Sequence, residues 1–127
     1  MQTHITKVAI IGAGAVGATV AFSLVVKGVA AEIALVDLKK EKAMGEMLDL
    51  AHSMDFQQRN VRVSYGGYEA CRDADIVIIT DEIGSGIVPL DIKEREWREV
   101  HGRICCQLAG RADAVFRVIA GIGQKIK

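Results

Sequence analysis

The sequence has 127 residues, about the length of one domain, so we expect a single domain over residues 1–127. That length excludes an enzyme with separate cofactor and substrate domains. Half of the residues are hydrophobic and a quarter are charged, which indicates a packed globular chain. The 16 basic and 16 acidic residues cancel, and neither half has the positive excess that binding to nucleic acid or an anionic membrane requires.

The cysteine spacing and one long uncharged run bear on the compartment. Cys71 and the adjacent pair Cys105 and Cys106 lack the spacing of a zinc site, so we expect reduced thiols and no metal. The run Val8–Val26 carries no charge, but glycines interrupt it after four apolar residues, which disfavours a membrane span. These features predict a cytoplasmic chain without a membrane partner.

Strand and helix patterns alternate in the first eighty residues. The expected elements are a strand over Lys7–Ile11, a helix over Ala15–Lys27 ended by Gly28, a strand over Glu32–Asp37, a helix over Lys39–Ser53, and strands over Val61–Tyr65 and Ala74–Thr80. This alternation predicts a parallel sheet with right-handed crossovers.

The rear of the chain continues the pattern after a loop over Asp81–Leu90. The expected elements are a helix that Asp91 caps and that ends near Gly110, a strand over Val115–Ala120, a turn at Gly121–Gly123, and a short antiparallel strand over Gln124–Lys127. Together the elements predict an α/β fold with a doubly wound parallel sheet of order 3-2-1-4-5, helices on both faces, and a short antiparallel strand at the C-terminal edge.

One glycine motif indicates a binding site for a dinucleotide. Gly12, Gly14 and Gly17 form G-x-G-x-x-G after a strand and at the start of a helix, and Asp37 follows Gly17 by 20 residues. In a Rossmann-like fold these glycines permit a tight turn, the approach of a pyrophosphate, and close packing of the helix on the strand. Asp37 accepts hydrogen bonds from the adenine-ribose hydroxyls and repels a 2′-phosphate, which favours NAD over NADP.

Two other interpretations of the motif remain to be weighed. The glycines could shape only a turn, with Asp37 as a solvated strand end. A triphosphate-binding loop is excluded, because Ala18 and Thr19 stand where that loop needs Lys-Thr, and the main charge for β- and γ-phosphates is missing.

The front of the chain resembles the cofactor-binding start of bacterial L-lactate dehydrogenases. The resemblance covers residues 5–80 and is carried by the segments KVAIIGAGAVGATVAFSLVVKG, EIALVDLKKEKAMGEMLDLAHS and YGGYEACRDADIVIIT. It implies that Val16, Asp37 and Lys42 contact NAD and that Tyr68 lines the adenine side. Taken alone, Lys42 fits a solvated helix lysine and Tyr68 a packed surface aromatic. The expected cofactor-binding residues are Gly12, Gly14, Ala15, Val16, Gly17, Asp37, Lys42, Tyr68 and Thr80.

Beyond Thr80 the chain resembles a different family, the bifunctional adenosylcobinamide kinase/guanylyltransferases. The segment DEIGSGIVP matches their N-E-V-G-x-G-I-V-P motif, with Asp81 in place of asparagine, and the end GIGQKIK matches their final hairpin. The two resemblances imply a constructed chimera, in which residues 1–80 are a dinucleotide-binding part and residues 81–127 are a grafted helix-strand-strand part.

The expected function is binding of NAD or ADP-ribose by a catalytically inactive monomer. We expect no catalytic residue, because the chain lacks a general acid and a carboxylate-binding cation, and His4, His52 and His101 fit structural or solvated positions. Binding is expected on the adenosine–pyrophosphate half, with the nicotinamide side left to loop residues Ile83–Ile87. The alternatives are a scaffold without useful affinity and a truncated L-lactate dehydrogenase-type oxidoreductase.

Overall fold

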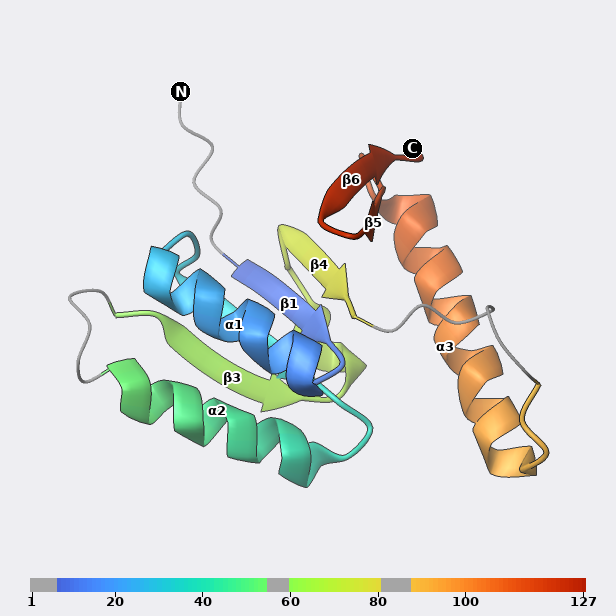
Figure 1. The fold of residues 1–127 in the computed structure, drawn as a ribbon, viewed down its shortest axis with the longest axis horizontal. Helices are drawn as coiled ribbons and strands as arrows, with labels where there is room; N and C mark the ends of the chain where they lie inside the picture. The colour runs from blue at the N-terminus through green and yellow to red at the C-terminus, as the bar shows by residue number, and fades with distance from the viewer. Residues whose placement is uncertain (1–6, 55–59, 81–87) are drawn as a thin grey trace. The chain divides into compact units, whose positions relative to one another are not determined.

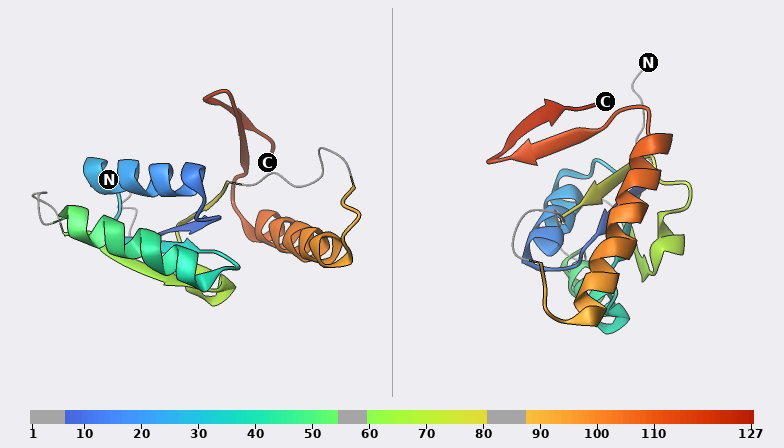
Figure 2. Two further views of the ribbon diagram at one scale, coloured as in Figure 1. Left: turned by 60° about the horizontal axis from the view of Figure 1, so that its bottom comes forward. Right: turned by 90° about the vertical axis from the view of Figure 1, so that its right-hand side faces the viewer.

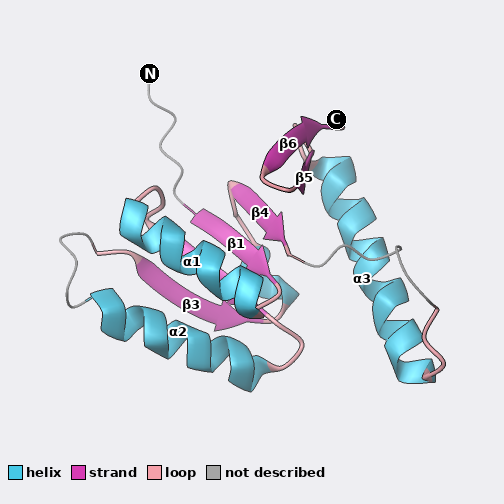
Figure 3. Ribbon diagram, in the orientation of Figure 1, coloured by secondary structure: helices cyan, strands magenta, loops and turns pink. Residues whose placement is uncertain are grey.

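The structure is a computed structural model that describes residues 7–54, 60–80 and 88–127. The chain divides into two compact units, Met1–Asp81 and Glu82–Lys127. The first unit contains β1 (Lys7–Ile11), α1 (Ala15–Lys27), β2 (Glu32–Val36), α2 (Lys40–Met54), β3 (Arg62–Gly66), the short 3₁₀ helix η1 (Tyr68–Cys71) and β4 (Ile76–Ile79); the second contains α3 (Ile92–Arg111), β5 (Phe116–Ile119) and β6 (Ile122–Lys125). Figure 3 shows how helices and strands alternate along the chain. The single domain over residues 1–127 stays a prediction.

The first unit contains a four-stranded parallel sheet of order β3-β2-β1-β4 (Figure 1). Ile10 in β1 pairs with Leu35 in β2 on one side and with Ile78 in β4 on the other. This order follows from right-handed crossovers that turn one way from β1 to β3 and the other way to β4. The α/β, Rossmann-like fold class is confirmed, as is the predicted order of these four strands.

The core lies around the two central strands. From their second residues onward, β1 and β2 are buried, and Ile10, Ile33 and Leu35 are completely so. Helices α1 and α2 lie over the same face of the sheet (Figure 1), where α1 packs through its small buried residues Gly17 and Ala21. This packing fixes the glycine loop between β1 and α1, because both of its ends belong to the core.

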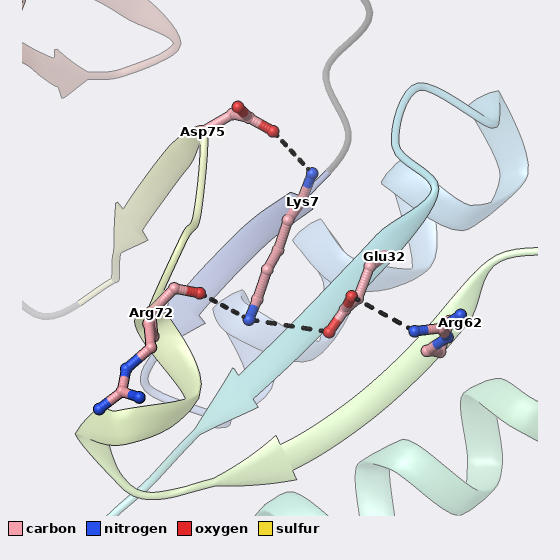
Figure 4. A network of polar contacts seen from close by, with 5 residues as sticks. All are labelled: Lys7, Glu32, Arg62, Arg72 and Asp75. Atoms are coloured by element: carbon pink, nitrogen blue, oxygen red, sulfur yellow. Dashed lines mark hydrogen bonds and ion pairs between the residues drawn. The ribbon is translucent and has the colours of Figure 1, made fainter.

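Charged groups hold the opposite end of the sheet, where the strands begin (Figure 4). The Lys7 backbone N–H donates to Asp75 at 2.9 Å, and its ammonium donates to the Arg72 carbonyl at 2.8 Å. The same ammonium lies 3.7 Å from the Glu32 carboxylate, which lies 3.9 Å from Arg62. These contacts connect β1, β2, β3 and the segment before β4, and they fix the sheet register far from the glycine loop.

The second unit contains a capped helix and a hairpin (Figure 2). Asp91 caps α3 as predicted, since its carboxylate accepts from the Glu94 N–H at 3.1 Å. The hairpin turn lies at Ala120 and Gly121, with φ values of 49° and 76°. The predicted turn at Gly121–Gly123 is therefore wrong, because β6 already begins at Ile122.

The predicted place of the fifth strand is also wrong. Among the described residues β5 pairs antiparallel with β6 in a separate two-stranded sheet, and the parallel sheet consists of four strands. A two-residue turn allows β5 and β6 to pair locally, whereas a parallel partner for β4 requires a long crossover. No described helix is long and apolar enough to cross a membrane.

Candidate cofactor-binding site

The glycine loop turns sharply between the end of β1 and the start of α1. Gly12 has φ of 102°, a backbone conformation that residues other than glycine rarely adopt. Its N–H donates to the Val36 carbonyl at 2.8 Å, which ties the turn to the end of β2. The loop therefore lies at the carboxyl edge of the sheet, where open α/β sheets bind ligands.

Gly17 allows helix α1 to begin directly against this turn. A Cβ atom at Gly17 would lie 1.8 Å from the Gly12 carbonyl oxygen and 3.5 Å from Ile10. The first of these distances is far too short for a carbon and an oxygen that are not bonded to each other, so only glycine fits at this position. The close packing expected of the third glycine is thus present in the structure.

Gly14 differs from Gly17, because the protein does not fill the space beside it. It is the N-cap of α1, and the nearest atom to a Cβ built there is the Lys42 ammonium nitrogen at 3.8 Å. Among the described residues no side chain caps this helix, and its first turn contains no acidic residue. Helix N–H donors and one ammonium group therefore face a space suited to an anion.

Asp37 follows β2, and its side chain forms a hydrogen bond with the backbone of the glycine loop. One carboxylate oxygen accepts from the Ala13 N–H at 2.9 Å, and the other accepts from the Lys39 N–H at 2.9 Å. A carboxylate offers about four acceptor positions, so each oxygen of this half-buried group keeps capacity for another donor. Asp37 can therefore hold the loop and accept from ribose hydroxyls at the same time.

Thr80 supports the loop from the side of β4. Its N–H donates to the Ile11 carbonyl at 3.1 Å, and its hydroxyl lies 3.2 Å from that oxygen and 3.3 Å from the Gly12 carbonyl. The structure thus places Thr80 at the glycine loop. Its described contacts are with the backbone that the loop is built on.

The remaining predicted residues surround the same edge. Ala15 and Val16 are exposed in the first turn of α1, and Tyr68 is half-buried in η1. The pairing of Val36 with Gly66 places the end of β3 beside the end of β2, so Tyr68 follows next to the Asp37 segment. One contributor was not predicted, the Ala13 N–H, because an alanine carries no recognisable signal at its position.

These features fit the ADP half of a dinucleotide. A side chain at Gly14 would occupy the space in front of the helix N-terminus, and the Asp37 carboxylate lies at the end of the neighbouring strand. The loop residues Ile83–Ile87, expected on the nicotinamide side, lie outside the described residues, as does Asp81. The described part of the site therefore includes the glycine loop and Asp37 but not the segment expected on the nicotinamide side.

The histidines lie in separate elements. His52 is exposed near the end of α2, and His101 is buried in α3, where its ring stacks on Trp97 with centroids 5.3 Å apart. His4 lies outside the described residues. The part of the chain that the structure describes contains no cluster of three or more metal-ligating side chains.

All three cysteines are free thiols. Burial raises the pKa of the Cys71 thiol, against the nearby Lys7 charge, which lowers it. Burial also raises the pKa of the Cys105 thiol. A raised pKa keeps the Cys71 and Cys105 thiols neutral near pH 7.

Comparison with known proteins identifies the family. The profile of the lactate/malate dehydrogenase NAD binding domain matches residues 6–85, more than half of the chain. L-lactate dehydrogenase of Bacillus velezensis is 48% identical over 79 residues, which are 62% of this chain and 25% of that protein. L-lactate dehydrogenase 1 of Peribacillus psychrosaccharolyticus is 35% identical over 119 residues, 92% of this chain and 37% of that protein.

A solved structure gives the same result. Lactate dehydrogenase from Eimeria maxima, crystallised with NADH and oxamate, superposes with a TM-score of 0.62 at 27% identity, over 87% of this chain and 32% of that one. The matched parts cover 25% to 37% of the length of these relatives. It belongs to the lactate/malate dehydrogenase family through its NAD-binding domain, which confirms the resemblance of the front part and NAD as the cofactor.

One expectation is overturned by this membership. We expected a chain that is not an enzyme, but its relatives are L-lactate dehydrogenases, which are enzymes. The expectation depended on catalytic groups missing from 127 residues, whereas the relatives are about two and a half times as long. The resemblance of residues 80–127 to adenosylcobinamide kinases, the chimera, the monomeric state and the cytoplasmic location stay predictions.

Proposed function

We propose that residues 7–80 bind the adenosine–pyrophosphate half of NAD and thereby provide the cofactor site of an L-lactate dehydrogenase-type oxidoreductase. One observation carries the proposal most directly. The protein leaves the space beside Gly14 open except for the Lys42 ammonium group, although it fills the corresponding space at Gly17 with backbone. The open space at Gly14 lies at the N-terminus of α1, where no described side chain accepts from the helix N–H groups, so it suits the negatively charged pyrophosphate.

Each part of the ADP group has a matching protein group. The backbone of residues 12–14 and the N-terminus of α1 receive the pyrophosphate, and Lys42 supplies a positive charge beside it. Asp37 accepts from the ribose hydroxyls, and Tyr68 lies at the adenine side. When bound, NAD supplies the hydride acceptor, while these residues bind and orient the cofactor.

Calorimetric titration with NAD, ADP-ribose and NADP tests the proposal. ADP-ribose is expected to bind about as well as NAD, because the described contacts lie on their shared half, and NADP more weakly because Asp37 repels its 2′-phosphate. Asp37→Ala is expected to cost about 1.5–3 kcal/mol of binding free energy, as for hydrogen bonds to a charged group, and to reduce the preference over NADP.

Asp49→Ala provides the matched control, because Asp49 is an exposed carboxylate of α2 and its removal changes the net charge equally. Circular dichroism of both variants separates lost binding from lost folding, since Asp37 also holds the Ala13 and Lys39 N–H groups. Unchanged NAD affinity in Asp37→Ala, or tighter binding of NADP than NAD by the unmodified chain, contradicts the ribose role of Asp37.

A further inference from the structure

The segment that carries Tyr68 depends on one acidic side chain. Gly66 ends β3, Gly67 is the N-cap of η1, and Tyr68 is its first residue. The η1 turn is closed by the Ala70 N–H, which donates to the Gly67 carbonyl at 3.0 Å. A 3₁₀ turn of four residues has little stability of its own, so contacts at its N-terminus decide its geometry.

Glu69 supplies such a contact. One carboxylate oxygen accepts from the Gly67 N–H at 2.9 Å, so the side chain folds back over the residue that begins the turn. The bond joins the N-cap N–H to a glutamate two residues later, one position closer than the glutamate of a capping box, and it satisfies the same N–H. The Gly67 N–H, which has no helical partner at the start of η1, therefore finds its acceptor in a side chain of the same turn.

The glycines before the turn leave the space that this carboxylate occupies. A Cβ atom on Gly67 would lie 2.4 Å from one Glu69 carboxylate oxygen, and a Cβ on Gly66 would lie 3.4 Å from the other. The Gly66–Gly67 pair and the Glu69 side chain are therefore complementary in shape. The hydrogen bond and the open space point to the same position of the carboxylate.

The electrostatic surroundings favour the charged carboxylate. Hydrogen bonds from its own N–H and from the Gly67 N–H lower the pKa of Glu69, and the Lys40 charge at the start of α2 lowers it further. The group is ionised at neutral pH and accepts more strongly than a neutral oxygen. The Lys40 charge at the start of α2 is therefore near enough to favour the ionised Glu69 carboxylate.

We propose that Glu69 is a positioning residue of the adenosine site, whose carboxylate fixes the Gly67 N–H and with it the backbone that places Tyr68. The proposal rests on the adenosine site proposed above and assigns that site a residue outside the glycine motif. Glu69 acts through η1 and makes no contact with the cofactor in this role.

Three variants distinguish a hydrogen-bonding role of Glu69 in η1 from an effect of its negative charge. Glu69→Ala removes the acceptor, Glu69→Gln keeps an amide oxygen of the same reach, and Glu41→Ala removes one negative charge from the exposed first turn of α2. Hydrogen exchange of the ligand-free chain gives a readout that needs no cofactor. The amides of Gly67 and Ala70 are expected to exchange about tenfold faster in Glu69→Ala, the loss of roughly one hydrogen bond. The increase is expected to be smaller in Glu69→Gln, whose neutral oxygen accepts more weakly, and absent in Glu41→Ala.

Titration with ADP-ribose provides the second readout. Affinity is expected to fall in Glu69→Ala and to be largely restored in Glu69→Gln, with Glu41→Ala like the unmodified chain. Unchanged exchange at Gly67 and Ala70 in Glu69→Ala overturns the proposal, and so does faster exchange with unchanged affinity. A failure of Glu69→Gln to restore affinity indicates a direct role of the charge and also overturns it. Absence of ADP-ribose binding by the unmodified chain overturns the proposed function itself, and the positioning role falls with it.

Discussion

At Gly17 the space for a side chain is already occupied by backbone. The Gly12 carbonyl oxygen lies 1.8 Å from the position of a Cβ atom, and the Gly12 N–H is bound to the Val36 carbonyl, so the turn cannot retreat without losing a bond. Gly17→Ala is therefore expected to lower the free energy of unfolding by about 3 kcal/mol, the upper range for overpacking. Urea denaturation followed by circular dichroism measures this loss.

Gly14→Ala is the matched control for this prediction. Its added methyl group meets only Lys42 at an ordinary contact distance, so the fold is expected to lose less than about 1 kcal/mol, typical of an N-cap exchange. The same methyl group lies in the space proposed for the pyrophosphate, so ADP-ribose affinity is expected to fall sharply. Equal stability loss in the two variants, or unchanged affinity in Gly14→Ala, would show that the two glycines do not differ in this way.

The geometry of the glycines could be predicted from spacing, but the contacts of Asp37 and Thr80 could not. A G-x-G-x-x-G pattern after a strand specifies a turn and a close helix start, because few backbone paths join those elements. The bond from the Ala13 N–H to Asp37 joins residues 24 positions apart, and the Thr80 hydroxyl bonds join residues 68 or 69 apart. Such contacts depend on strand register, which one sequence does not specify at atomic detail.

The bounds of helices and strands were predicted best where a glycine in the sequence marks the end of the element. β1 and α1 have the predicted bounds, since β1 ends at the glycine loop and Gly28 ends α1 with φ of 59°. The η1 helix was missed, because four residues show no helical period and its support comes from the Glu69 side chain. The hairpin turn was predicted at Gly121–Gly123 because glycine is the usual residue in a left-handed turn conformation. The turn lies one residue earlier, because Ala120 adopts that conformation in the structure.

The C-terminus of α3 is held by a lysine from the end of the chain. The Lys127 ammonium group donates to the carbonyls of Ala109, Gly110 and Ala112 at 2.9, 3.0 and 2.7 Å. A cation there satisfies free carbonyls and opposes the negative end of the helix dipole, which is typically worth about 0.3–1 kcal/mol at an exposed position. Lys127→Met is expected to destabilise α3 by about that amount.

Fluorescence of the single tryptophan, Trp97 in α3, follows this unfolding in urea. Lys125→Met is the control, because it removes an equal charge from an exposed position of β6. Added salt is expected to reduce the difference between the unmodified chain and Lys127→Met, since part of the effect is electrostatic. Equal loss in Lys125→Met would assign the effect to net charge and not to the helix end.

At the scale of the whole molecule, β5 pairs with its neighbour in sequence, β6, whereas we predicted that it pairs with the more distant β4. The order of β1 to β4 follows from handedness and from helices long enough to cross the sheet, and those signals lie in the sequence. The strand after α3 shows the same apolar pattern, but a two-residue turn joins it to β6 and makes an antiparallel pair accessible at low entropic cost. Pattern alone does not distinguish these two partners.

Cofactor binding is expected to stabilise the sheet as a whole, because the proposed site joins the ends of β1, β2 and β4. A ligand that binds only the folded state adds about 2.7 kcal/mol at a hundredfold excess over its Kd. With ADP-ribose at that excess, the buried amides of Ile10 and Leu35 are therefore expected to exchange about a hundredfold more slowly, provided that they exchange through global unfolding. Nicotinamide mononucleotide, at the same concentration, lacks the adenosine half and is expected to leave these rates unchanged. Equal protection by the mononucleotide would place the binding energy on the nicotinamide half and contradict an adenosine–pyrophosphate site at the glycine loop.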